Sequence, residues 1–214
     1  YILGMFNNDT IYQTIAFIYA MPPSWGAAHP ASEVKAGINM LYPKKMAEQI
    51  KSAKTQYDYV FVLPHWGVEY TYWPVPGDVN IAKLFIESGA DGIFGSHTHQ
   101  VQTYRRYSNK PVFYSLGNFI FPDFYMDVLR PVCYPDDNLD KIPVSYNYEK
   151  ELKTIVKRVW KDINRIGMIT SVLLDESKID YRIQYTKLNK NNTLERLRRR
   201  IQLKEHIDPE AAVE

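Results

Sequence analysis

Short apolar runs alternate with segments of helical periodicity along the first half of the chain. Residues 14–20 and 59–63 are continuous apolar runs bounded by more polar or turn-forming residues, a pattern typical of strands buried on both faces of a sheet. Two further segments carry apolar residues on one helical face, namely Met46, Ala47, Ile50 and Ala53 in the first and Ile81, Leu84, Phe85 and Ile86 in the second. The second segment ends at Ser88-Gly89, where glycine suits a left-handed helix C-cap.

A third run of strand character, residues 91–96, completes the order strand, helix, strand, helix, strand. This order is typical of right-handed βαβ units, so the sequence predicts an α/β fold with a largely parallel sheet. Residues 111–115 predict one more short strand, which leads into a turn at Gly117-Asn118.

The second half of the chain carries less regular patterns. Residues 122–143 are rich in Tyr, Asp and Pro without periodicity and predict a surface excursion. Residues 152–163 have apolar side chains at helical spacing and predict an amphipathic helix with a solvated basic face. Residues 168–174 and 179–185 predict a hairpin that extends the sheet antiparallel. The basic run at 196–200 predicts the solvated face of a terminal helix.

Composition places the chain among ordinary globular proteins. Its 214 residues are 45% apolar and 23% charged, which excludes disordered and fibrous classes for most of the chain. A formal net charge of +2 argues against a nucleic-acid partner, and the single cysteine, Cys133, excludes an internal disulfide framework. The chain opens on Tyr1 and holds no targeting signal or long apolar span, so we expect a piece of a longer protein whose membrane association would depend on a segment outside it.

Three of the five histidines lie where predicted strands end. His65 follows the run 59–63, and His97 and His99 follow the segment that ends at Gly95-Ser96. Ligands of parallel sheets gather at strand ends, and neutral imidazole suits zinc, iron, nickel or manganese. Three such residues, two of them in a loop that Gly95 allows to be tight, predict a metal site. Carboxylate, amide or water oxygens would have to complete a two-metal shell.

Four motifs together resemble the bacterial capsule-synthesis family of CapA type, which acts in poly-γ-glutamate biosynthesis. The motifs are His65-Trp66-Gly67-Val68-Glu69-Tyr70, Ser88-Gly89-Ala90-Asp91, Gly95-Ser96-His97-Thr98-His99 and Tyr114-Ser115-Leu116-Gly117-Asn118-Phe119. The resemblance covers residues 14–121 well and the hairpin after Gly167 loosely. It implies that residues 1–188 are the C-terminal part of a four-layer α/β/β/α sandwich of metallophosphoesterase type. Residues 122–166 would be an insertion in it, and 189–214 a charged tail.

The resemblance also implies a site. His65 and His97 would bind one divalent ion and His99 a second, the ions being manganese, zinc or iron. Glu69, Asn118 and Trp66 would contact substrate or support the ligands. The family's first half supplies an early aspartate and an Asn-Asn-His element, and neither precedes Thr14 here, so the chain is expected to lack half of its metal ligands. No residue is assigned a catalytic role.

Three functions stay open at this point. The resemblance favours a capsule or poly-γ-glutamate biosynthesis protein at the cell envelope or its extracellular face, with an anionic polymer or the synthesis machinery as partner. The second is a metal-dependent phosphoesterase-like hydrolase that acts on a phosphorylated small molecule or lipid. The third is a non-catalytic binding module. Without the first half of a sandwich, an uncovered sheet edge and apolar face predict a chain that associates with itself.

Overall fold

A computed structural model of the protein describes residues 2–8, 11–21, 30–31, 34, 37–127, 155–175 and 178–197. The helices are α1 (Pro43–Lys54), α2 (Pro76–Glu87) and the 3-10 helix η2 (Asp162–Arg165). The strands are β1 (Ile2–Asn8), β2 (Ile11–Ala20), β3 (Tyr59–Pro64), β4 (Gly92–Phe94), β5 (Tyr104–Tyr107), β6 (Lys110–Phe113), β7 (Phe124–Asp127), β8 (Ile155–Arg158), β9 (Ile166–Asp175), β10 (Lys178–Leu188) and β11 (Leu194–Arg196).

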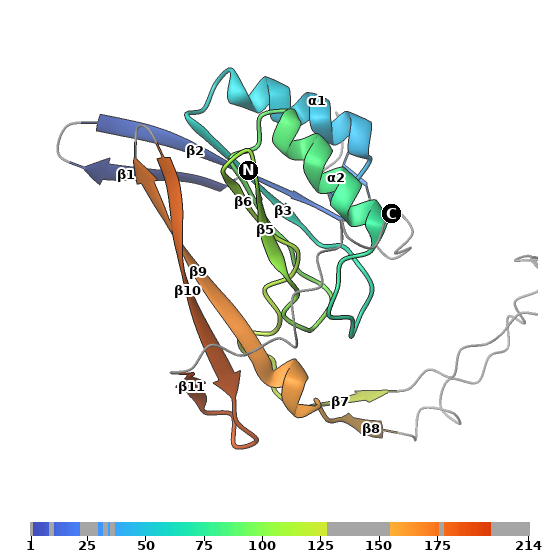
Figure 1. Cartoon of the computed structure of the whole chain (residues 1–214). Helices are drawn as coiled ribbons and strands as arrows, with labels where there is room; N and C mark the ends of the chain where they lie inside the picture. Colours follow the sequence, from blue (N-terminus) through green and yellow to red (C-terminus); the bar gives the residue numbers. More distant parts are fainter. Residues whose placement is uncertain are drawn as a thin grey trace, which may run out of the picture.

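Six strands form the main sheet in the order β1-β2-β3-β4-β6-β5. β2, β3, β4 and β6 run parallel, and β1 and β5 are added antiparallel at the two edges. The successive parallel strands β2, β3 and β4 are joined through α1 and α2, as the sequence predicts, and Figure 1 shows both helices on one face of the sheet. The predicted α/β class is therefore confirmed. The edge strand β1 has no counterpart among the predicted strands.

The two α-helices begin and end where local chemistry favours it. Each carries a proline in its first turn, Pro43 in α1 and Pro76 in α2, because the fixed φ of proline suits that position. α2 ends as predicted, since Gly89 takes a φ of +109° directly after the C-cap residue Ser88. The buried helix residues, Met46, Ile50, Ala82, Phe85 and Ile86, share one core with Val60, Val62, Ile93 and Val112 of the sheet. Among the described residues, no helix has the length and apolarity needed to cross a membrane.

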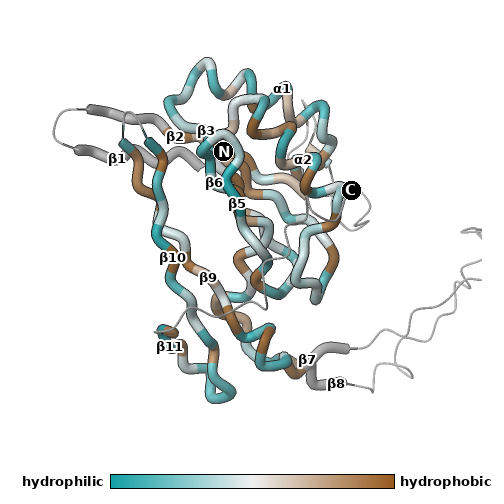
Figure 2. Tube along the Cα trace, viewed as in Figure 1, coloured by the Kyte–Doolittle hydropathy of each residue, from teal (hydrophilic) through white to brown (hydrophobic). Residues whose placement is uncertain are grey.

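A second sheet covers the opposite face of the main sheet. It has the order β11-β10-β9, with antiparallel pairing throughout. Figure 2 shows apolar and polar positions alternating along β10, as expected of a strand with one buried face. The inward side chains of this sheet, Met168, Val172, Leu174, Ile179, Tyr181, Ile183 and Tyr185, pack against Phe17, Phe61, Phe94 and Phe113.

The predicted hairpin is therefore present, but the prediction that it extends the main sheet is wrong. α1 and α2 cover only one face of the main sheet, which leaves its other, aromatic face to be covered by β9 and β10. The described part of the chain thus has three layers, helices on sheet on sheet.

The helix predicted over 152–163 is also wrong where the structure describes that segment. Ile155–Arg158 is strand β8, paired antiparallel with β7, and η2 follows it. Trp160 is 5% exposed and donates its backbone N–H to Asp123 Oδ1 (3.0 Å) and its indole N–H to Pro122 O (3.2 Å). Ile155 and Val156 are β-branched, which favours a strand. This preference and the contacts of Trp160 together outweigh the helical spacing of the apolar residues. Most of the predicted surface excursion, residues 128–143, lies outside the described residues.

The C-terminal end departs from prediction in the same way. Leu194–Arg196 pairs with β10 as strand β11, so the first arginine of the basic run lies in a strand and not in a helix. The rest of that run, residues 198–200, lies outside the described residues.

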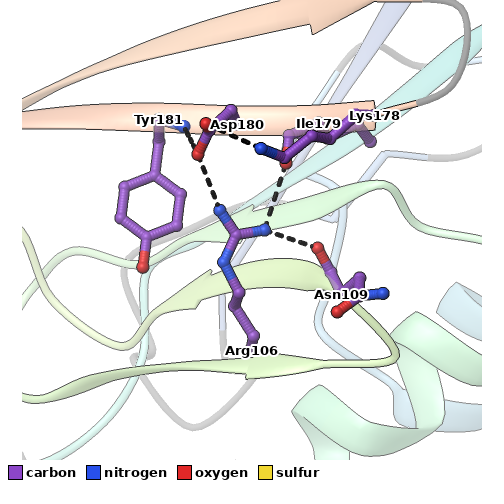
Figure 3. Close-up of polar contacts among 6 residues, drawn as sticks. All are labelled: Arg106, Asn109, Lys178, Ile179, Asp180 and Tyr181. Atoms are coloured by element: carbon purple, nitrogen blue, oxygen red, sulfur yellow. Dashed lines mark hydrogen bonds and ion pairs between the residues drawn. The ribbon is translucent and has the colours of Figure 1, made fainter.

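An exposed polar cluster fastens the second sheet to the β5–β6 hairpin (Figure 3). The Arg106 guanidinium donates to Ile179 O (3.1 Å) and Asn109 O (2.7 Å) and forms an ion pair with Asp180 (3.0 Å). Its Cζ atom also lies 4.5 Å from the ring centroid of Tyr181. Tyr181 contacts Phe113 edge-on, with centroids 5.0 Å apart. The contact between the layers therefore has an apolar centre and a polar rim.

Candidate metal centre

The carboxyl ends of β3 and β4 bring the histidine-bearing segments together. His65 donates its N–H to Ala20 O (2.8 Å) and pairs with Ser96 in a parallel bridge. The next residue, Trp66, donates its backbone N–H to Ser96 O (3.2 Å). The pairing of β3 with β4 therefore continues to the point where His65 and His97 leave the sheet. In open α/β sheets this edge is where ligands bind.

The three imidazoles form one cluster. The ring centroids of His65 and His97 lie 5.0 Å apart, and those of His97 and His99 lie 6.3 Å apart. Partial burial lowers the pKa of His65 and of His97, and neighbouring imidazoles lower both pKa values further. The Glu69 carboxylate opposes this and raises the pKa of His97. The balance favours neutral imidazole, which is the form that binds a metal ion.

The loop that carries His97 and His99 has an unfavourable backbone conformation. His97 has a φ of +99° and His99 a φ of +54°, and Tyr70, which stacks beside His99, has a φ of +64°. Residues other than glycine rarely adopt positive φ, and each such residue costs on the order of 1–3 kcal/mol. Strain of this kind persists only where surrounding contacts enforce it, and it is concentrated at functional sites.

Hydrogen bonds fix the orientation of two of the imidazoles. His99 Nδ1 lies 2.9 Å from Asn118 Oδ1, and His65 Nδ1 lies 3.0 Å from Ser96 Oγ. Asn118 is buried, and its Nδ2 donates to the backbone carbonyl of Asn164 (2.8 Å). Metal-binding histidines commonly use their second ring nitrogen in this way, which fixes the tautomer. Asn118, predicted to contact substrate or support a ligand, lies with its amide oxygen against the imidazole of His99.

The other two residues predicted around the site, Trp66 and Glu69, lie in contrasting environments. Trp66 is 2% exposed, and its indole N–H donates to Tyr114 O (2.9 Å). It therefore belongs to the core beneath the site. Glu69 is exposed and acts on His97 through its charge.

Aromatic side chains surround His99. The ring centroids of Trp160, Phe121 and Tyr70 lie 4.9, 5.3 and 6.1 Å from that of His99. No sequence pattern assigns Trp160 or Asn164 to the site, because the segment that holds them has the spacing of a surface helix. The side-chain amide of Asn164 donates to the backbone carbonyl of His99 (3.0 Å). The two residues are 65 positions apart, so no local sequence signal predicts this hydrogen bond.

The donor chemistry suits a metal ion, but the set of ligands is incomplete. Within the part of the chain that the structure describes, no three side chains among His, Cys, Asp and Glu are placed to hold one ion. The imidazoles offer nitrogen donors, two of them with anchored rings, and further ligands must be added before an ion is fully coordinated.

Comparison with known proteins decides the family. Residues 12–123, a little over half of the chain, match the family model described as bacterial capsule synthesis protein PGA_cap. The chain belongs to this family. The match to the capsule synthesis family includes all three clustered histidines and Asn118. It ends at Asp123, before Trp160 and Asn164.

Curated relatives from the same family align with a similar part of the chain. The capsule biosynthesis protein CapA of Bacillus anthracis is 38% identical over 95 residues, which are 42% of this chain and 23% of the relative. The PGA biosynthesis protein CapA of Bacillus subtilis is 34% identical over 96 residues, 45% of this chain and 25% of the relative. A probable polyglutamine synthesis accessory protein of Mycobacterium tuberculosis is 32% identical over 75 residues, 35% of this chain and 20% of the relative. The alignments thus span a quarter or less of the length of these relatives.

A buried carboxylate, Asp78, lies beneath the imidazole-bearing loops, in the first turn of α2. A Cβ atom placed on Gly67 would lie 3.3 Å from Asp78 Oδ2 and 3.0 Å from Thr98 Cγ2, so the carboxylate lies close to both loops. Burial raises the pKa of Asp78 to about 6, and a hydrogen bond with the backbone of Val75 opposes this shift.

Replacing Asp78 by asparagine is expected to stabilise the protein at neutral pH. The folded-state pKa lies above the unfolded value, so the folded state binds more protons between about pH 4 and pH 6. Wild-type stability therefore falls as the pH rises through this window. We expect Asp78→Asn to be more stable than the wild type by about 1–2 kcal/mol at pH 7.5 and nearly equal at pH 4. Urea unfolding measures both values, and a gain that does not change with pH would contradict the prediction.

Proposed function

We propose that this chain carries the C-terminal share of a capsule-synthesis domain that binds divalent metal ions through His65, His97 and His99. The domain would act on an anionic capsule polymer such as poly-γ-glutamate, or on the machinery that assembles it. One observation carries the proposal: in a chain of the capsule synthesis family, three histidines meet at the carboxyl ends of β3 and β4 with neighbouring ring centroids 5.0 and 6.3 Å apart. The names of the Bacillus relatives, capsule biosynthesis and PGA biosynthesis proteins, support a capsule polymer as the substrate or partner.

In this proposal, His65 and His97 hold one ion and His99 holds a second. Divalent ions, when bound in pairs, supply Lewis acidity and an activated water for attack on a phosphate-like group. The chain itself supplies neutral nitrogen donors, anchored through Ser96 and Asn118. The aromatic side chains around His99 limit the access of bulk water to it. The remaining ligands would come from the part of the longer protein that precedes this chain.

The complete domain, in the same proposal, is a four-layer α/β/β/α sandwich of metallophosphoesterase type at the cell envelope. The outward face of the second sheet supports the fourth layer, because Ile169 and Leu173 on β9 are 39% and 43% exposed. A helix packed on this face would bury them, as helices α1 and α2 do for the main sheet. The envelope location rests on the capsule role named for the relatives.

Metal content tests the central part of the proposal. The 214-residue chain and a His97→Ala, His99→Ala double variant are loaded with manganese or zinc, dialysed and measured by elemental analysis. A His29→Ala, His206→Ala variant is the matched control, because it removes two histidines that are not in the proposed site. We expect stoichiometric metal in the wild type and the control, and its loss in the His97, His99 variant.

Two results would contradict the metal site. Equal metal in all three proteins would place the ligands elsewhere, and no metal in any of them would show that the histidines in this chain do not hold an ion. Circular dichroism spectra of the three proteins control for loss of fold.

A non-catalytic binding module is the second candidate, favoured by the lack of a complete three-ligand set among the described residues. Tyr72 and Trp73 are 48% and 37% exposed on the loop after His65. Gln102 Nε2 holds this loop by donating to Thr71 O (3.2 Å) and Trp73 O (3.1 Å). An ordered loop with exposed aromatic rings suits contact with a polymer chain. Binding of poly-γ-glutamate by the metal-free protein, and loss of this binding in Trp73→Ala, would favour this candidate.

A further inference from the structure

Asn164 closes a ring of three hydrogen bonds with His99 and Asn118. Its side-chain Nδ2 donates to the backbone carbonyl of His99 (3.0 Å), and its own carbonyl accepts from Asn118 Nδ2 (2.8 Å). The ring is completed between Asn118 Oδ1 and His99 Nδ1 (2.9 Å). Asn164 is 3% exposed and lies in η2, beyond the part of the chain that matches the family.

The direction of these hydrogen bonds determines the tautomer of His99. A backbone carbonyl only accepts, so the carbonyl of Asn164 must face the NH2 group of Asn118. The amide oxygen of Asn118 then faces His99, and it too only accepts. His99 therefore carries its proton on Nδ1 and its lone pair on Nε2.

The segment that holds Asn164 is fixed by contacts outside the histidine cluster. Arg165 is buried, forms an ion pair with Asp123, and donates its Nε–H to Trp160 O (3.3 Å). Trp160 in turn donates its backbone N–H to Asp123 Oδ1 (3.0 Å). Within η2, the N–H of Asn164 donates to Lys161 O (2.9 Å). The side-chain amide of Asn164 is thus presented to His99, and its backbone carbonyl to Asn118, by a turn that other contacts hold in place.

We infer that the backbone of Asn164 positions His99: its carbonyl orients the amide of Asn118, and the oxygen of that amide selects the imidazole tautomer with its lone pair on Nε2. The consequence for metal binding rests on the proposed function, whereas the tautomer does not. A segment outside the family match would then complete the support of a histidine inside it.

Nuclear magnetic resonance of 15N-histidine-labelled protein tests the inference at a fixed pH of 8, where an ordinary imidazole is neutral. Two-bond 1H–15N correlations distinguish the two tautomers, and a His99→Gln variant assigns the His99 signals. We expect the Nδ1-protonated form to dominate in the wild type by roughly tenfold, the effect of one buried hydrogen bond. Asn118→Ala should lose this preference, because it removes the oxygen that accepts from Nδ1–H, whereas alanine at position 164 would keep the backbone carbonyl that orients Asn118. Asp162→Ala is the matched control, because Asp162 is exposed in the turn that holds Asn164.

A wild-type His99 protonated on Nε2 would overturn the inference, and this result needs no variant to fold. An unchanged tautomer in folded Asn118→Ala would overturn it as well. Zinc affinity provides the second measurement, and we expect it to be about 10-fold weaker in Asn118→Ala and unchanged in Asp162→Ala. If the tautomers are as expected but the wild type binds no zinc, the proposed metal site is refuted and the positioning role remains.

Discussion

Replacing Gly95 by alanine is expected to prevent folding or to destabilise the protein by more than about 4 kcal/mol. A Cβ atom on Gly95 would lie 2.0 Å from Tyr114 O and 2.5 Å from Trp66 Nε1. Neither atom can move away easily, because Tyr114 O accepts the hydrogen bond of the buried Trp66 indole (2.9 Å). Gly95 is itself fixed on both sides, since its N–H donates to Phe113 O (2.7 Å) and its carbonyl accepts from Leu116 N (3.0 Å). The added Cβ atom would therefore clash where the hydrogen bonds of Tyr114 O and of the Gly95 backbone leave no room for adjustment.

Gly77→Ala is the matched control for this substitution. Gly77 lies in α2, and an added Cβ would meet no atom within 4 Å. Alanine has the higher helix propensity, so we expect a change between zero and a gain of about 1 kcal/mol. Urea unfolding of both variants and of the wild type measures the effects. A loss below about 1 kcal/mol in Gly95→Ala would show that the close approach is absent in solution.

Gly95 also shows which part of the candidate site is readable from the sequence. His65, His97 and His99 can be placed at strand ends because an apolar run followed by polar residues marks such an end locally. The pattern assigns Gly95 to a tight turn, whereas the positive φ values fall on His97 and His99. Glycine is required at position 95 because Tyr114 and Trp66 pass close to its Cα atom. Such an approach depends on tertiary structure and leaves no periodic signal.

The fold also has elements that local sequence predicts and elements that depend on tertiary structure. α1, α2 and the strands β2, β3 and β4 follow from periodicity, capping residues and the βαβ order, all of which are local. The second sheet could be predicted as a hairpin but not as a separate layer, because that depends on which face of the main sheet the helices leave open. The spacing predicts a helix where β8 lies, because spacing alone does not reveal that Trp160 is held by Asp123 and Pro122. Asn164 was missed for the same reason.

Removing the carboxylate of Asp91 is expected to be the second large effect, about 2–4 kcal/mol for Asp91→Ala. Asp91 is 5% exposed and lies just before β4. Its Oδ2 accepts from the buried Val60 N–H (2.9 Å) and lies 2.7 Å from Lys54 Nζ, and its Oδ1 lies 3.6 Å from Lys110 Nζ. One carboxylate thus joins α1, β3 and β6 at the end of the sheet opposite the histidines.

Asp91→Asn separates the two contributions to this effect. The amide oxygen can still accept from Val60 N–H, so this variant loses the charge and retains the buried hydrogen bond. The side chains of Lys54 and Lys110 are 36% and 27% exposed, and water can solvate them when the ion pairs are lost. The unpaired Val60 N–H has no such replacement, because Val60 is fully buried. We therefore expect Asp91→Asn to lose about 1 kcal/mol and Asp91→Ala two- to fourfold more in urea unfolding. Equal losses would mean that the ion pairs, and not the buried hydrogen bond, dominate the stabilisation at this end of the sheet.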